Sequence, residues 1–273
     1  MRHRWFKFGQ IKIGSYCDYV LTGTTNLEGG AASQRKIEYI DTDGCEFRDI
    51  LYNARSFEIS GFIKAYNDIE MVELKRRLIA ACSAKEKFRL EYFNRKKIYS
   101  AECYFDQLPT FSSRQQWFLP FKLYLTIPGF YWQSGELHTL KLFGYKDEVI
   151  DTFTLPCVFT SIANQAEISN SGDVETYPVF VVSCNTAVAD STIIINNLTT
   201  HKSITVNYAA SAGEVVTIDS FNQTVTSSLN GNITNMVSID SEFFSLQKGT
   251  NRLSAVSAGS TATLQFRENY LGV

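Results

Sequence analysis

The residues that could support catalysis are few and widely separated in this chain. The three histidines are His3, His138 and His201, and none has a metal-ligating residue three or four positions away. The sequence contains no nucleophile elbow, no zinc-binding H-E-x-x-H, no phosphate loop and no dinucleotide-binding fingerprint. A glycosidase needs only two facing carboxylates, so the 28 acidic residues leave that class open. We expect no catalytic residue and therefore no enzyme.

One group of acidic residues surrounds a glycine and has to be considered as a calcium site. Asp41, Asp43 and Glu46 flank Gly44, but an EF-hand loop needs a third oxygen ligand before its glycine and a glutamate at position twelve. Short aspartates and a glycine are also the usual residues of a tight turn, because they satisfy local amides and tolerate positive φ. The sequence predicts a turn here and no metal.

The six cysteines are too scattered for a zinc knuckle or a C-x-x-C pair, at positions 17, 45, 82, 103, 157 and 184. Scattered cysteines are typical of a reducing cytosol. The basic start Met1–Arg4 is not followed by the apolar stretch of a signal peptide. No apolar run approaches the roughly 18 residues that a membrane span needs. We expect reduced thiols, no cofactor and no membrane partner.

Composition changes along the chain and indicates two units. Up to Ile150 there are 22 Lys+Arg and 18 Asp+Glu, whereas from Asp151 onward there are 4 and 10. A chain of 273 residues also exceeds most single domains. We predict a first domain at residues 1–132 and a second at residues 133–273.

The first domain is predicted to be β-rich with one helix. Asn67 can cap a helix from about Ile69 to Cys82, with Glu70 three residues later. An apolar stripe at 3-4-3 spacing would face the sheet, made of Met71, Leu74, Leu78 and Ala81. Residues 56–63 alternate like a half-buried strand, and residues 88–105 form a hairpin that turns at 94–97.

A run of aromatic residues follows the apolar strand at 117–127. Pro128 and Gly129 end that strand, and Phe130, Tyr131 and Trp132 come directly after it. Aromatic side chains are costly to leave in water. We therefore place the joint between the two domains just after this element, with Pro128 in its turn and the three aromatic residues wedged between the halves.

The second domain has the pattern of an antiparallel β-sandwich, with short Val, Ile and Thr runs separated by Asn, Gly and Ser. The expected strands are Val179–Val182, Ile193–Ile195, Ile204–Tyr208, Val215–Ile218, Phe243–Leu246 and Ala262–Phe266. Asn197, Asn222 and Asn232 begin glycosylation sequons. Without an export signal we interpret them as turn residues.

Three motifs in the second half carry a resemblance to a known family. They are Thr176-Tyr177-Pro178-Val179-Phe180, then Gly213-Glu214 with Ile218-Asp219, then Leu246-x-x-Gly249-x-Asn251. In this order and spacing they resemble the distal tail protein family of long-tailed siphophages. Two elements of the first half, at 57–62 and 128–132, fall where that family has an alternating strand and a Pro-aromatic element. Lys248 departs from the pattern, because the family more often has proline there.

The resemblance implies a mainly β protein with one helix and two β-sandwich domains, the second galectin-like or carbohydrate-module-like. It implies a homohexameric ring at the virion tail tip, between the tail-tube protein and a tail-associated hub or fibre protein. Receptor-binding proteins are further candidate partners, and phage DNA would pass through without specific binding. A chain of 273 residues leaves no room for an inserted carbohydrate-binding module, which favours the short, structural form.

Two other functions remain open from the sequence. A glycan-binding adhesin would stack an exposed aromatic residue on a sugar ring, and Tyr177, Tyr208 and Phe221 are the candidates in the second domain. A cell-wall hydrolase would have to turn over peptidoglycan or polysaccharide, which we do not expect.

Overall fold

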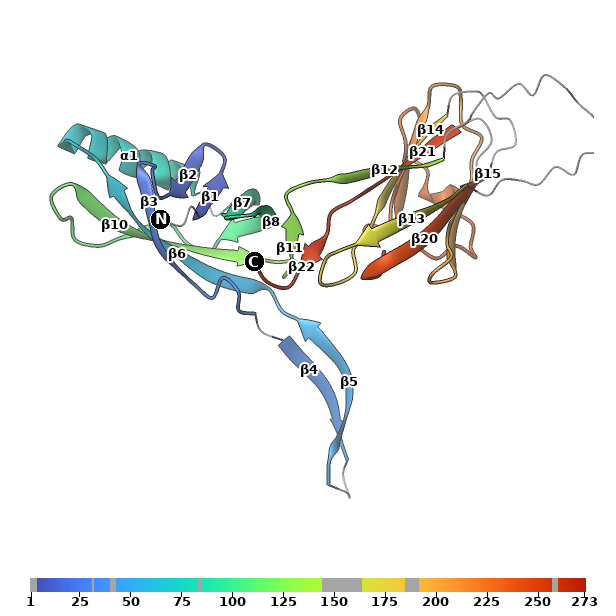
Figure 1. Ribbon diagram of the computed structural model, residues 1–273, viewed down its shortest axis with the longest axis horizontal. Helices are drawn as coiled ribbons and strands as arrows, with labels where there is room; N and C mark the ends of the chain where they lie inside the picture. Colours follow the sequence, from blue (N-terminus) through green and yellow to red (C-terminus); the bar gives the residue numbers. More distant parts are fainter. Residues whose placement is uncertain are drawn as a thin grey trace, which may run out of the picture. The chain divides into compact units, whose positions relative to one another are not determined.

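The chain was analysed as a computed structural model, which describes residues 4–30, 32–39, 43–82, 85–143, 164–184, 192–256 and 260–273. It divides into two compact units, Met1–Gly135 with Tyr270–Val273, and Glu136–Asn269 (Figure 1). The predicted boundaries, 1–132 and 133–273, therefore differ at both ends. The last four residues pack with the first unit, because Tyr270 contributes to its hydrophobic core.

The first unit is built on a closed seven-stranded barrel. Its strands are β1 (Arg4–Phe8), β2 (Ile11–Gly14), β3 (Tyr19–Thr25), β6 (Arg55–Lys64), β7 (Phe88–Asn94), β8 (Lys97–Phe105) and β10 (Phe118–Ile127). They follow one another in the order β8-β7-β1-β2-β3-β6-β10, and β10 pairs again with β8 at Leu125 and Phe105. The resemblance to the family implied a sandwich here instead. Alternating strands are common to both architectures, and only the β8–β10 pairing, between segments about twenty residues apart, closes the barrel.

Three short strands extend this sheet beyond the barrel. They are β9 (Thr110–Phe111), β11 (Trp132–Ser134) and β22 (Asn269–Tyr270). Inside the barrel, alternate residues of each strand are buried, as Phe57, Ile59 and Ile63 of β6 illustrate. Full burial of each such side chain stabilises the folded state by about 1.5–3 kcal/mol. The barrel therefore has a hydrophobic core of its own.

The predicted helix is present as α1 (Asp68–Ala81). Asn67 caps it by accepting a hydrogen bond from the amide of Glu70 at 2.8 Å, and Glu70 accepts one from the amide of Tyr66 at 2.7 Å. Met71, Leu74 and Leu78 are buried, as the apolar spacing predicted, whereas Ala81 is exposed. The helix ends one residue earlier than predicted, because Cys82 forms its C-cap and the backbone amide of Cys82 donates to carbonyls of the last turn.

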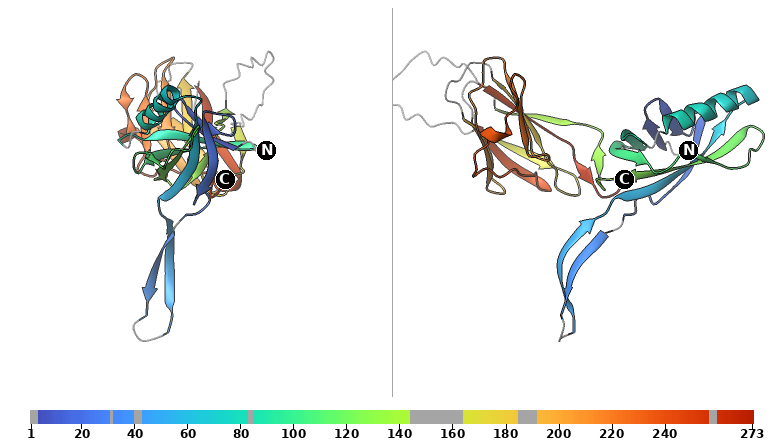
Figure 2. Two further views of the ribbon diagram at one scale, coloured as in Figure 1. Left: turned by 90° about the vertical axis from the view of Figure 1, so that its left-hand side faces the viewer. Right: turned by 180° about the vertical axis from the view of Figure 1, so that it is seen from behind.

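Strands β4 (Ala32–Glu38) and β5 (Cys45–Tyr52) form a two-stranded sheet of their own. Figures 1 and 2 show this ribbon leaving the barrel by itself. Every residue of β4 is exposed, and in β5 only Cys45 is partly covered. Asp43 and Gly44, in the predicted turn, lie near the tip, where Gly44 has a φ of 120°; Asp41 lies outside the described residues.

An aromatic–cation stack fixes the root of the ribbon. The ring of Phe130 lies between Tyr52, with centroids 4.4 Å apart, and the guanidinium of Arg55, 4.3 Å from its centroid. Gly30 lies so close that an added Cβ would come within 2.2 Å of the Phe130 ring. Arg55, only 1% exposed, also donates to the carbonyls of Leu27 at 3.3 Å and Leu271 at 2.5 Å. The start of the ribbon and the C-terminal segment are thus tied to the same side chain.

These contacts correct the prediction that the aromatic residues at 130–132 are wedged between two halves. Trp132 is fully buried in the core of the first unit, beside Phe57 and Tyr92. Phe130 is 5% exposed and packs against the ribbon root, with Tyr131 edge-on to it. The barrel offers Trp132 an apolar core within one unit, which is why that ring turns inward there.

The second unit consists of two antiparallel sheets that share one hydrophobic core. The larger sheet has the order β12-β21-β14-β17-β18-β19, with strands His138–Phe143, Ser260–Phe266, Val179–Cys184, Val215–Asp219, Thr224–Ser227 and Gly231–Asn232. The smaller has the order β13-β20-β15-β16, with strands Asn164–Asn170, Gly249–Val256, Thr192–Asn197 and Lys202–Asn207. Phe180 and Ile195 are examples of inward residues from each sheet, both fully buried.

One predicted strand of this unit is absent. Residues Phe243–Leu246 form no strand and contribute only an isolated bridge between Leu246 and Thr176. Phe244 and Leu246 are nevertheless buried, at 2% and 0% exposure. The alternation of the sequence therefore predicted burial correctly, although this segment forms no ladder.

Replacing Arg55 by methionine should destabilise the first unit by about 2–4 kcal/mol, because two buried carbonyls lose a charged donor. Calorimetry should show a lower melting temperature for the first unit and an unchanged transition for the second. Arg55→Lys, which keeps the charge but loses the two-pronged geometry, should fall between. Exposed Arg252→Met is the surface control, and an equal effect there would contradict the assigned role.

Candidate assembly interface

The residues that could do chemistry are not brought together among the described residues. His138 stacks on Phe266 and lies 3.7 Å from Glu268, whereas His201 occupies an exposed turn with φ of 57°. His3 lies outside the described residues. Within the described parts of the chain, no three His, Cys, Asp or Glu side chains form a group that could hold a metal ion.

The described cysteines are all unpaired thiols, namely Cys17, Cys45, Cys82, Cys103 and Cys184. Cys157 lies outside the described residues. Burial raises the pKa of the Cys82 thiol to about 12, so it remains protonated and unreactive. None of the helices that the structure describes has the length and apolar character to cross a membrane.

Several motif residues of the second unit hold turns. Asn251, fully buried, accepts from the amide of Gln247 at 2.9 Å and donates to the carbonyls of Gln247 at 2.8 Å and Gly249 at 3.1 Å. Gly249 has φ of 92°, where a side chain would be strained. Leu246, fully buried, exchanges two backbone hydrogen bonds with Thr176. The motif at 246–251 is therefore a clamped turn that leads into β20.

The other motif residues lie at the turn between β17 and β18. Asp219 accepts hydrogen bonds from the amides of Phe221 at 2.9 Å and Asn222 at 3.0 Å. Pro178 is buried and its carbonyl accepts from Ser220. Tyr177 and Phe221 are 42% and 72% exposed and meet edge to face, with centroids 5.6 Å apart. This aromatic pair presents an apolar surface to solvent.

The sequon asparagines all act as local hydrogen-bonding residues. Asn197 is fully buried and accepts from the amides of Thr199 and Thr200 at 3.0 and 3.1 Å. Asn222 donates to Asp219, and Asn232 accepts from the amide of Thr234. The buried Asn197 amide is inaccessible to a glycan, in keeping with its interpretation as a turn residue.

A buried carboxylate organises another corner of the second unit. Glu214, 1% exposed, accepts from the hydroxyls of Tyr208 and Ser227 and from the amide of Ser211. Ser227 itself accepts from two backbone amides, so its proton is free for Glu214. Burial alone raises the pKa of Glu214, but the hydrogen bonds from Ser227, Tyr208 and Ser211 outweigh it and hold that pKa below its usual value. Tyr208 is committed to this network.

The ribbon has one apolar face, which the sequence analysis missed. Residues that pair directly across strands share a face, and the pairs Lys36–Phe47, Gln34–Ile50 and Ala32–Tyr52 put Phe47, Ile50 and Tyr52 on one side, whereas Leu51 lies on the other. Phe47 and Ile50 are 60% and 54% exposed there. On the same face, Lys36 forms an ion pair with Glu38 at 3.0 Å. The alternation of apolar and polar residues within 45–52 could have predicted this face. A β-bulge near Arg35 and Lys36, however, changes which residues of β5 share a side.

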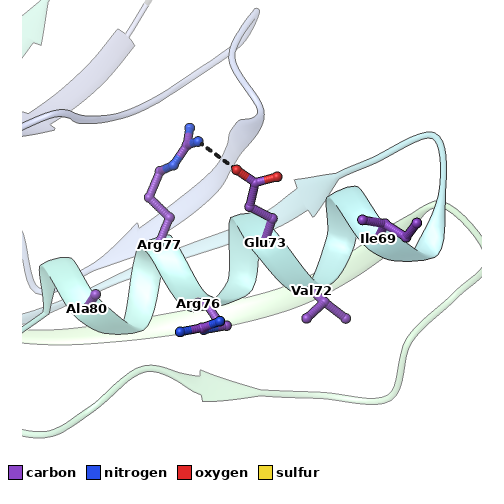
Figure 3. Close-up of a pocket in the computed structure, with 6 residues that line it drawn as sticks. All are labelled: Ile69, Val72, Glu73, Arg76, Arg77 and Ala80. Atoms are coloured by element: carbon purple, nitrogen blue, oxygen red, sulfur yellow. Dashed lines mark hydrogen bonds and ion pairs between the residues drawn. The ribbon is translucent and has the colours of Figure 1, made fainter.

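A second uncovered apolar row lies on the outer face of α1, opposite the buried stripe. The shallow depression there is lined by Ile69, Val72, Glu73, Arg76, Arg77 and Ala80. Ile69 and Val72 are 82% and 60% exposed. Figure 3 shows Val72 and Arg76 on one side of the helix and Glu73 paired with Arg77 on the other, with a nitrogen–oxygen distance of 3.4 Å. Among the described residues, the ribbon and α1 thus each expose an apolar row beside an ion pair.

Comparison with known proteins finds a family match in the second half of the chain. Residues 171–270 match the family described as "Siphovirus-type tail component, C-terminal domain". Residues 171–270 therefore belong to this family of siphovirus-type tail components. A match to a structural tail component supports the predicted place at the virion tail tip and the prediction that the chain is not an enzyme. No curated protein matches the sequence.

Solved structures share the fold over the whole length. The SPP1 Dit protein, described as a paradigm of the hub adsorption apparatus in Gram-positive-infecting phages, is 12% identical with a TM-score of 0.72, over 97% of this chain and 98% of that one. A chain of the phage P2 baseplate in its activated, calcium-bound conformation is 10% identical with a TM-score of 0.58, over 100% of both chains. A chain of the strontium-bound form of that baseplate is 11% identical with a TM-score of 0.58, again over 100% of both chains.

The Glu214 network makes the second unit's stability depend on pH. Because the folded pKa of Glu214 lies below its unfolded value, its stabilisation is complete above the unfolded pKa and is lost as pH falls through the folded pKa. Glu214→Gln should lower the free energy of unfolding by about 1–3 kcal/mol at pH 7. The gap to the parent should shrink as the pH is lowered below about 4.

Calorimetry of the second unit's transition at several pH values tests this. Glu242→Gln, at an exposed ion pair with Lys202, should change little at any pH. A gap between parent and Glu214→Gln that stays constant down to pH 2 would contradict the assigned ionised state.

Proposed function

We propose that the chain forms a ring, as a homohexamer, that serves as the hub of the tail tip. The ring joins the tail-tube protein to a tail-associated hub or fibre protein and supports host attachment, with receptor-binding proteins as further partners. Phage DNA passes through the open axis without specific binding. The family assignment and the likeness to a hub protein and to baseplate chains support this role.

The observation that carries the proposal is the uncovered ribbon. A two-stranded hairpin is only marginally stable in water and needs a third strand or a helix against its apolar face. Phe47 and Ile50 are exposed on that face, and β4 and β5 pair only with each other. A protein whose cores are otherwise closed would gain by covering this face with another copy.

Ring closure requires two different complementary patches on each copy. The ribbon is one patch, and it belongs to the first unit. The second unit has few cations and a surface rich in Ser, Thr and Asn, which suits an outward-facing scaffold. We propose that this unit is the galectin-like domain that projects from the ring and receives neighbouring tail proteins.

Phe47→Asp should weaken self-association by at least about tenfold, because a carboxylate would replace an apolar contact. Native mass spectrometry and light scattering over a range of concentrations should find six copies for the parent and smaller species for the variant. Leu229→Asp, at a 65% exposed position of the second unit, is the matched control. If the parent stays monomeric, both alone and when mixed with tail-tube and hub proteins, the proposed ring is overturned.

A second candidate function rests on the exposed Tyr177–Phe221 pair. Exposed aromatic faces are the usual contact for sugar rings, and this pair is supported by the polar turn at Asp219. The other aromatic candidate, Tyr208, is bonded to Glu214. Glycan binding lost in Phe221→Ala and kept in Tyr208→Phe would establish this function, whereas a glycan array without any signal for the parent would remove it.

A further inference from the structure

We propose that the apolar face of the β4–β5 ribbon of one copy docks on the outer face of α1 of the next. This deepens the ring proposed above and rests on it, since it names the two surfaces that meet. The occupant of each surface is a second copy of this chain.

The two surfaces match in kind. A two-stranded ribbon is stabilised by a helix against its apolar face, and α1 has an apolar row that its own barrel does not cover. That row consists of Ile69, Val72 and Ala80, opposite the buried stripe. The row on the ribbon consists of Phe47 and Ile50. Joining them covers apolar surface on both copies and leaves each barrel core unchanged.

The lengths of the two elements also agree. Eight residues of β5 span about 26 Å at roughly 3.3 Å per residue. Fourteen residues of α1 span about 21 Å at 1.5 Å per residue. The helix can therefore lie along most of the ribbon, and the contact needs no other element.

Charge complementarity sets the direction. On the ribbon, Lys36 and Glu38 lie beside the apolar row, two residues or about 7 Å apart along the strand. On the helix, Glu73 and Arg77 lie beside its row, four residues or about 6 Å apart along the axis. Lys36 can thus face Glu73 while Glu38 faces Arg77. In this orientation the tip of the ribbon points toward the C-terminal end of α1.

Arg76 adds a cation to the same end of the contact. It is exposed and lines the depression on α1. Near the tip of the ribbon, Asp43 is an exposed acidic residue, whereas Glu46 pairs with Ile37 and lies on the opposite face. The reversed orientation would bring Lys36 against Arg77 and Glu38 against Glu73, and like charges across an interface are unfavourable. The charges therefore select one direction, as a head-to-tail ring requires.

Charge reversal on either surface tests the contact. Lys36→Glu would face Glu73, and Glu73→Lys would face Lys36, so each variant alone should need about a tenfold higher concentration to assemble. Mixed in equal amounts they should assemble again. In an alternating ring every altered ribbon then meets an altered helix, and every unaltered ribbon meets an unaltered helix. Lys202→Glu, an exposed charge reversal in the second unit, should assemble like the parent.

Native mass spectrometry of the mixture, with one variant isotopically labelled, should show rings that contain both chains. A photoreactive residue at Val72 should crosslink to peptides of 32–52 from another copy. Rings that form equally well from each single variant, or a mixture that fails to recover, would overturn this contact while leaving the ring itself intact. A parent chain that never forms a ring would overturn both proposals.

Discussion

Two strands cannot bury their own apolar face, and that constraint governs the first unit. The barrel closes on itself and needs nothing from outside, since β8 and β10 remove its open edges. The ribbon of β4 and β5 is left with an apolar face and no covering layer. Its root is therefore fixed firmly, by Phe130 between Tyr52 and Arg55, while the rest remains available to another chain.

The second unit follows a different rule, because its apolar residues already face each other across two sheets. Its distinctive residues are polar and lie in turns. Asn251 satisfies three backbone groups of one turn, Asp219 orders another, and Glu214 gathers two hydroxyls and an amide. Apolar core positions can be exchanged for one another at small cost, whereas these turns each need a particular side chain. The residues that resembled the family are largely of this kind.

The sequence predicted what depends on neighbours along the chain. The cap at Asn67, the buried stripe of Met71, Leu74 and Leu78, and the mainly β character all follow from local spacing. Contacts between segments that are distant along the chain could not be predicted from the sequence. Closure of the barrel depends on one pairing between β8 and β10, and the inward turn of Trp132 depends on Phe57 and Tyr92 being adjacent. The ribbon face was hidden by a bulge that changes which residues of β5 share a side.

The exposed ion pairs beside the two apolar rows are better suited to fixing the orientation of the contact between copies than to stabilising the folded chain. Pairs such as Lys36–Glu38 and Glu73–Arg77, whose side chains are at least half exposed, contribute little in water because solvent screens them. The apolar rows can supply association energy, but apolar surfaces by themselves do not distinguish one orientation from its reverse. Charges placed at matched spacing do distinguish the two orientations, and they cost the free chain little stability. The barrel and the sandwich can then fold within a single copy, since both cores are closed, and the ribbon acquires its orientation only when it meets the next copy.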